Sequence, residues 1–170
     1  MEKIAVIDGD SIIFSGFHPN KVLDDKGKPL IVDKKFVYID KTEYEIRDSC
    51  DVIMNNILKY TRSTHYIFPV KGKNTADYRK SINSDYKSTR PKESPKYWNF
   101  TKNYLISRWG AFEVNNMEVD DFVNIYRLWD KNSFIVAIDQ DLLGLESINS
   151  HYNWRTWKWI NVTKDEEEKK

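Results

Sequence analysis

Short apolar runs and amphipathic segments alternate along the chain. Continuous apolar runs predict three buried strands, at residues 3–8, 65–68 and 133–138. Apolar side chains spaced three and four apart predict three helices, at residues 42–62, 95–108 and 117–129. Strands that alternate with helices indicate right-handed crossovers and a mostly parallel sheet. The pattern therefore predicts an α/β fold with a central sheet flanked by helices.

Local signals set the limits of some of these elements. Thr42 and Glu45 have the spacing of a capping box, so a helix is expected to begin there. We expect this helix to use four apolar side chains as its buried positions: Val52, Ile53, Ile57 and Tyr60. Pro69 is expected to end the strand over residues 65–68.

Two further segments have the pattern of β-hairpins. The sequence DDKGKP at residues 24–29 is a turn signal between Val22-Leu23 and the extended stretch 30–39. Aromatic and polar residues alternate over 151–162, and a short strand is expected at 112–114. We assign residues 1–162 to one domain and the charged residues 163–170 to a solvated tail.

The composition is that of a globular chain. Of its 170 residues, 40% are hydrophobic and 14% aromatic, which excludes a disordered polymer. The single cysteine, Cys50, forms no internal disulfide and indicates a reducing compartment. The opening MEKIAVIDGD lacks the pattern of a signal peptide, and no apolar stretch approaches the length of a bilayer span. We therefore expect a cytoplasmic protein without membrane contact.

Acidic residues gather at places that the predicted fold would bring together. There are three groups: Asp8 and Asp10; Glu118, Asp120 and Asp121; and Asp139 and Asp141. The functional crevice of a parallel sheet lies beyond the carboxyl ends of its strands, where the first and last groups fall. Residues two apart on a strand share a face, as do Glu118 and Asp121, three apart on a helix. Clustered carboxylates repel one another unless a hard cation neutralises them, which favours Mg²⁺ or Mn²⁺ over Zn²⁺.

Each acidic group also has a purely structural explanation. Carboxylates in the first turn of the helix at 117–129 complement its dipole. The first pair suits a turn, and the last pair suits a cap of the segment that follows. The conjunction of all three groups at the ends of predicted parallel strands is what favours a metal site.

The segment between the first two acidic groups is basic. Over residues 71–102 there are nine Lys and Arg and three acidic residues, a net charge of +6, whereas the whole chain carries +1. Tyr78, Tyr86, Tyr97 and Trp98 lie among these cations. Such a mixture suits phosphate contacts and base stacking on a single strand. An ordinary solvated loop is the alternative explanation.

Four motifs, in order and spacing, resemble the phage branch of the flap-endonuclease-like 5′-nucleases. VIDGDSIIF matches a first strand that ends in a metal-binding Asp, here Asp8, and YRKSINSDYKSTR at 78–90 matches the basic arch segment. EVDD at 118–121 matches the start of a helix, and DQDLLGL at 139–145 matches the end of a later strand. The resemblance covers nearly the whole chain and implies a PIN-like α/β fold with a basic arch.

The resemblance also implies roles for individual residues. The metal ligands, direct or through water, would be Asp8, Glu118, Asp120, Asp121, Asp139 and Asp141. The nucleic-acid contacts would be Arg79, Lys80, Tyr86, Lys87, Arg90 and Lys92, with Arg79 and Lys87 also catalytic. Two Mg²⁺ or Mn²⁺ ions would support hydrolysis of phosphodiesters at 5′ ends or flaps of DNA or RNA–DNA duplexes. Replication proteins are expected partners.

Two departures from the family keep other functions open. The second strand is followed by FPVKGKN, without the acid that several relatives have, and no helix-three-turn-helix module with its GDxxDN pattern occurs up to Lys170. We expect either that the chain is a fragment or that it is a short protein whose duplex-binding module is absent or supplied by a partner. A nuclease-like domain that binds branched or single-stranded DNA without cutting it is the first alternative. A haloacid-dehalogenase-like phosphatase, suggested by Asp8-Gly9-Asp10-Ser11, is the second.

Overall fold

A computed structural model describes residues 3–89, 93–139, 142 and 151–160. Within this part, five strands form the central sheet in the order β11–β10–β9–β1–β6. They are β1 (Ile4–Ile7), β6 (His65–Ile67), β9 (Ser133–Val136), β10 (His151–Asn153) and β11 (Lys158–Ile160). All neighbouring pairs are parallel except β10 and β11. The predicted α/β fold with a mostly parallel sheet is confirmed.

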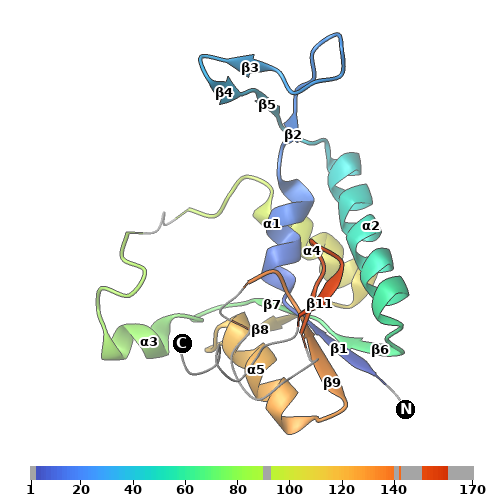
Figure 1. Cartoon of the computed structure of the whole chain (residues 1–170). Helices are drawn as coiled ribbons and strands as arrows, with labels where there is room; N and C mark the ends of the chain where they lie inside the picture. The colour runs from blue at the N-terminus through green and yellow to red at the C-terminus, as the bar shows by residue number, and fades with distance from the viewer. Residues whose placement is uncertain (1–2, 90–92, 140–141, 143–150, 161–170) are drawn as a thin grey trace.

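Helices cover both faces of this sheet (Figure 1). Successive residues of a strand point to opposite faces, and β1 divides its side chains in this way. Ala5 and Ile7 join a core shared with α1 (Gly9–Phe17), α2 (Glu43–Thr61) and α4 (Trp98–Trp109). Val6 joins a second core with α5 (Val119–Trp129). The three layers explain why the strands read as continuous apolar runs.

Helix α2 begins at the predicted capping box, and two of its four expected apolar positions, Ile53 and Ile57, belong to the core while the other two do not. Thr42 Oγ1 accepts a hydrogen bond from the Glu45 N–H, and Glu45 Oε2 accepts one from the Thr42 N–H. Val52 and Tyr60, expected to be buried, are 51% and 52% exposed. The buried stripe runs at helical spacing through Ile46, Cys50, Met54, Ile57 and Thr61, which leaves both residues on the outer side.

Helix α1 was not predicted, and its presence corrects the expectation for Asp10. The helix starts at Gly9, directly after β1, so Asp10 lies in a helical first turn and not on a strand face shared with Asp8. Gly9 makes the tight junction possible: a Cβ there would lie 2.3 Å from the Pro69 carbonyl oxygen. A strand and a helix are thus joined without a loop, which places both carboxylates near the sheet edge.

A second pair of strands lies beside the central sheet. Strand β7 (Pro69–Lys71) pairs in parallel with β8 (Phe112–Val114), the short strand expected at that position. Strand β6 ends at Ile67, two residues before Pro69, in agreement with the expected end of that strand, and Pro69 begins the separate strand β7. A proline at the first residue of a strand removes no hydrogen bond that the ladder needs inside the strand.

Residues 20–39 project away from the helices and the sheet (Figure 1), and the hairpin predicted there is present only in part: a bridge between Leu23 and Pro29 flanks the expected turn, while the paired strands lie around a second turn. Strand β2 (Asn20–Lys21) pairs with β5 (Tyr38–Ile39), and β3 (Ile31–Val32) pairs with β4 (Lys35–Phe36). Asp33 and Lys34 both have positive φ, 49° and 62°, as the turn between β3 and β4 requires.

The remaining elements agree with the sequence to within a few residues. Helix α4 begins at Trp98 where residue 95 was expected, and α5 begins at Val119 with Glu118 as its N-cap. The terminal hairpin is present as β10 and β11, while its expected end at residues 161–162 lies outside the described residues. The basic segment contains a short helix, α3 (Asp77–Ile82). None of the helices in the described ranges is long and apolar enough to cross a membrane.

Candidate functional site

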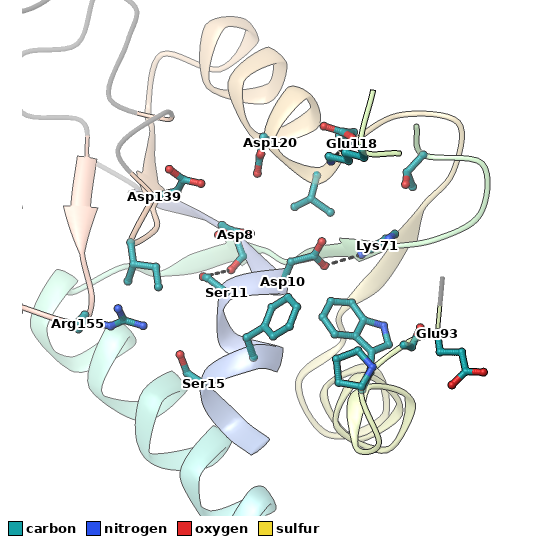
Figure 2. Close-up of a pocket in the computed structure, with 18 residues that line it drawn as sticks. Asp8, Asp10, Ser11, Ser15, Lys71, Glu93, Glu118, Asp120, Asp139 and Arg155 are labelled. Carbon is teal, nitrogen blue, oxygen red and sulfur yellow. Dashed lines mark hydrogen bonds and ion pairs between the residues drawn. The ribbon is translucent and has the colours of Figure 1, made fainter. Parts of the chain in front are cut away.

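A cavity of about 750 Å³ lies beyond the carboxyl ends of β1 and β9, between α1 and α5 (Figure 2). Six carboxylates line it: Asp8, Asp10, Glu93, Glu118, Asp120 and Asp139. Three cations also line it: Lys71, Lys87 and Arg155. Residues far apart in the sequence thus meet in one acidic cavity, at the sheet edge where a functional crevice was predicted.

Asp8 is the deepest of these carboxylates. It is the N-cap of α1, and its backbone carbonyl accepts a hydrogen bond from Ser11 Oγ at 2.8 Å. Among the described residues, its buried Oδ1 has no hydrogen-bond partner. Burial, together with the charges of Asp10 and Asp120, raises the pKa of Asp8 to about 7. An orphaned oxygen on a carboxylate that is costly to ionise is a feature that a bound cation would relieve.

Asp10 lies two residues after Asp8, in the first turn of α1, and is anchored by strand β7 of the second sheet. Its Oδ1 accepts a hydrogen bond of 2.9 Å from the backbone N–H of Lys71, the last residue of β7. Burial raises the pKa of Asp10 to about 6, although the Lys71 N–H and ammonium act in the opposite direction. The hydrogen bond points this carboxylate into the cavity (Figure 2).

Asp120 and Asp139 face the same cavity from α5 and from the end of β9 (Figure 2). Burial raises the pKa of Asp120, and the charges of Asp139 and Glu118 raise it further. Carboxylates from three separate segments of the chain therefore interact electrostatically in this cavity. A bound divalent cation would neutralise this mutual repulsion.

Glu118 is held by the basic segment. Its Oε1 lies 2.5 Å from Lys87 Nζ, its Oε2 lies 3.2 Å from an Arg79 guanidinium nitrogen, and Tyr86 donates a hydrogen bond of 3.0 Å to it. Burial acts to raise the pKa of Glu118, but the Lys87 and Tyr86 hydrogen bonds outweigh it and the pKa is lowered. The cations that were expected to contact phosphate here neutralise an acidic side chain instead.

Asp121 points away from the main cavity. It lines a second cavity of about 580 Å³ on the other side of the start of α5, together with Arg79. Arg79 bridges Asp121, at 2.7 Å, and Glu118, at 3.2 Å. The prediction that Glu118 and Asp121 share a side of the helix is thereby confirmed, but Asp121 does not line the cavity that Asp8, Asp10, Asp120 and Asp139 share.

The structure places none of the remaining predicted site residues in the main cavity, as far as it describes them. Lys80 is exposed on α3. Asp141, Arg90 and Lys92 lie outside the described residues.

Sequence reasoning missed several residues that line the cavity, most of all Ser15 and Arg155. Ser15 belongs to the unpredicted helix α1, four residues after Ser11 and therefore on the same helix face. Arg155 follows β10, which was predicted as half of a hairpin but not as a parallel neighbour of β9. That pairing brings the end of β10 to the cavity. The sequence pattern that could have indicated it is the apolar run 133–138, which is followed by a strand rich in aromatic residues.

The donor set suits a hard cation in chemical type. The candidate ligand atoms are carboxylate oxygens, which hard cations prefer, and Oδ1 of Asp8 is buried without a hydrogen-bond partner among the described residues. Over residues 3–89, 93–139, 142 and 151–160, however, no three acidic, histidine or cysteine side chains are close enough together to hold a metal ion. A bound ion would therefore have to draw the carboxylates of Asp8, Asp10 and Asp120 together.

Comparison of the chain with protein-family models and with curated proteins finds no match. The resemblance to 5′-nucleases therefore rests on the four sequence motifs.

Proposed function

We propose that the chain is the catalytic domain of a metal-dependent 5′-nuclease with a PIN-like fold. The observation that carries the proposal is the meeting of Asp8, Asp10, Asp120 and Asp139 in one cavity that also receives Lys87 from the basic segment. Acidic ligands beside cations suit a substrate that is itself anionic, because a phosphodiester can bind divalent ions on one side and ammonium or guanidinium groups on the other.

Asp8, Asp10, Asp120 and Asp139 would hold the ions in this proposal. Two Mg²⁺ or Mn²⁺ ions, when bound, would activate water and stabilise the leaving oxygen of an in-line displacement. The chain contributes the orientation of the carboxylates: the Lys71 N–H fixes Asp10, and the end of β1 fixes Asp8. Lys87 and Arg79, once released from Glu118, would offset charge on the reacting phosphate.

The proposed substrates are 5′ ends or flaps of DNA or RNA–DNA duplexes. The basic segment supports a strand-binding role, since Arg79 and Lys87 each lie within 6 Å of the ring of Tyr86 and so combine cation and aromatic surface. Replication proteins of a phage would be natural partners, and the host cytoplasm its compartment. The reduced, buried thiol of Cys50 is compatible with that compartment.

One observation favours a second candidate, a nuclease-like domain that binds DNA without cutting it. Glu118, which the resemblance assigns to the metal, is already neutralised by Lys87 and Arg79. A domain that kept this arrangement permanently would have lost one metal ligand while keeping a cationic surface.

Cleavage and binding of the same oligonucleotide separate these candidates. A 5′-labelled flap substrate is incubated with the full chain and Mg²⁺, and a parallel sample contains EDTA. The nuclease proposal predicts short 5′ products with Mg²⁺ alone, lost in Asp120→Asn but kept in Asp48→Asn, which changes an exposed carboxylate on α2. Metal-dependent binding without products would support the second candidate and overturn the first.

A further inference from the structure

We propose that Arg155, with Ser15, binds a backbone phosphate of the substrate strand next to the phosphodiester that is cleaved. This proposal rests on the proposed function and adds a contact that none of the four sequence motifs contains. Both residues line the acidic cavity, on the side away from Lys71 and Glu93 (Figure 2).

The position of Arg155 is fixed by its neighbours in the chain. Strand β10 pairs in parallel with β9, so the end of β10 lies at the same sheet edge as Asp8 and Asp139. Trp154 is buried in the core, and Asn153 Oδ1 accepts hydrogen bonds from the N–H groups of Arg155 and Thr156, at 2.9 and 3.0 Å. A buried anchor and a closed turn therefore hold the arginine backbone at the cavity wall.

The guanidinium of Arg155 is available for a ligand. Within the described part of the chain, it forms an ion pair with none of the carboxylates, although six of them line the same cavity. Lys87, by contrast, is already paired with Glu118. The guanidinium lies 6.0 Å from the centre of the Trp154 ring, which supports its planar group from one side.

The lining of the cavity also contains a neutral donor. Ser11 and Ser15 lie one turn apart on the face of α1 that lines the cavity. Ser11 Oγ donates to the Asp8 carbonyl, while no hydrogen bond of the Ser15 hydroxyl is formed among the described residues. A guanidinium and a hydroxyl in the lining of one acidic cavity suit a phosphate group, because arginine presents paired donors to its oxygens.

The inferred ligand is thus a phosphate of a nucleic-acid strand that runs from the carboxylates toward the β10–β11 turn. Lys87 lies on the opposite side of the same cavity, beside Glu118. A strand that crosses the cavity would be held by cations at both ends with the reacting phosphate between them, an arrangement that fixes the phosphate by two flanking contacts.

The test is a scan with single methylphosphonates, which remove the charge of one phosphate at a time. Binding of each modified strand to the full chain is measured by fluorescence anisotropy in Ca²⁺, with the strand checked on a gel for integrity. The wild type should lose affinity at the position that faces Arg155. Arg155→Ala should bind the unmodified strand about tenfold more weakly and show no further loss at that position.

Three companion variants separate a phosphate contact from a structural role. Arg155→Lys should restore part of the affinity, and Ser15→Ala should reduce sensitivity at the same phosphate. Lys131→Ala removes an exposed cation before β9, at the opposite sheet edge, and should leave the scan unchanged. The slope of log affinity against log salt concentration should fall by about 0.7 for Arg155→Ala, the value for one phosphate contact on a single strand.

An Arg155→Ala scan with the same position-dependent losses as the wild type would overturn the assignment. So would a uniform loss at every position that is accompanied by a lower melting temperature. Failure of the wild-type chain to bind any strand would overturn the proposed function itself, and with it this contact.

Discussion

Replacing Asp8 by Asn should stabilise the metal-free protein at alkaline pH. The buried Asp8 has an ordinary pKa of 3.8 in the unfolded chain and a pKa of about 7 in the fold, because burial and the charges of Asp10 and Asp120 oppose its ionisation. A difference of about 3 in pKa corresponds to about 4 kcal/mol of folding free energy. Asparagine keeps the shape of the side chain and never carries the charge.

The sign of this effect follows from proton binding. Below pH 3.8 the carboxyl is protonated in both states, so the stability linked to its raised pKa is fully present. As the pH rises toward 7, the unfolded chain releases the proton while the fold retains it, and this stability is lost. Glu118 has a lowered pKa and acts in the opposite direction only at acidic pH, below its ordinary 4.5. Between pH 5 and pH 8, the change in stability with pH therefore reports the carboxyl groups whose pKa is raised.

Urea unfolding at pH 5, 6, 7 and 8 in EDTA measures the effect. The difference between Asp8→Asn and wild type should grow toward alkaline pH, to as much as about 4 kcal/mol at pH 8. Asp48→Asn, on the exposed side of α2, should follow the wild-type curve. A constant difference across this range, or a variant less stable than wild type at pH 8, would refute the electrostatic reasoning.

Three further predictions concern packing and ion pairs. Lys87→Met should lower the free energy of unfolding by about 1–2 kcal/mol in urea, because buried Glu118 keeps only Arg79 and Tyr86 as partners; Lys80→Met, an exposed control, should change it by less than about 0.5 kcal/mol. Gly9→Ala should lower the melting temperature although alanine favours helices, since its Cβ would clash with the chain at β7; a rise would contradict this packing. Cys50, whose pKa burial raises to about 12, should react with a thiol reagent only after unfolding, and rapid labelling of the native protein would contradict its burial.

The sheet and most helices could be predicted because their apolar patterns are long. The capping box at Thr42 and the apolar runs at β1 and β9 agree with the structure. Helix α1 could not be found in this way, because it is short and follows β1 without a turn signal. The tight junction at Gly9 depends on the distant carbonyl of Pro69, a contact that no local pattern reveals.

The candidate site was predicted in its residue types more fully than in its geometry. Asp8, Asp120 and Asp139 were expected together, and all three line one cavity. The pairing of Glu118 with Lys87, and the separation of Asp121, depend on how the basic segment packs against α5. Charge spacing along the sequence indicates that such residues can meet, but it does not decide which of them neutralise one another.

The proposed function depends on a divalent cation that binds among Asp8, Asp10 and Asp120. Titration of the metal-free chain with Mn²⁺, followed by the electron paramagnetic resonance signal of the free ion, measures this binding without a nucleic acid. We predict saturable binding that Mg²⁺ displaces and that Asp8→Asn and Asp120→Asn weaken, while Asp48→Asn binds as the wild type does. A wild-type chain that takes up no Mn²⁺, or binds it equally well in all three variants, would contradict the proposed metal site.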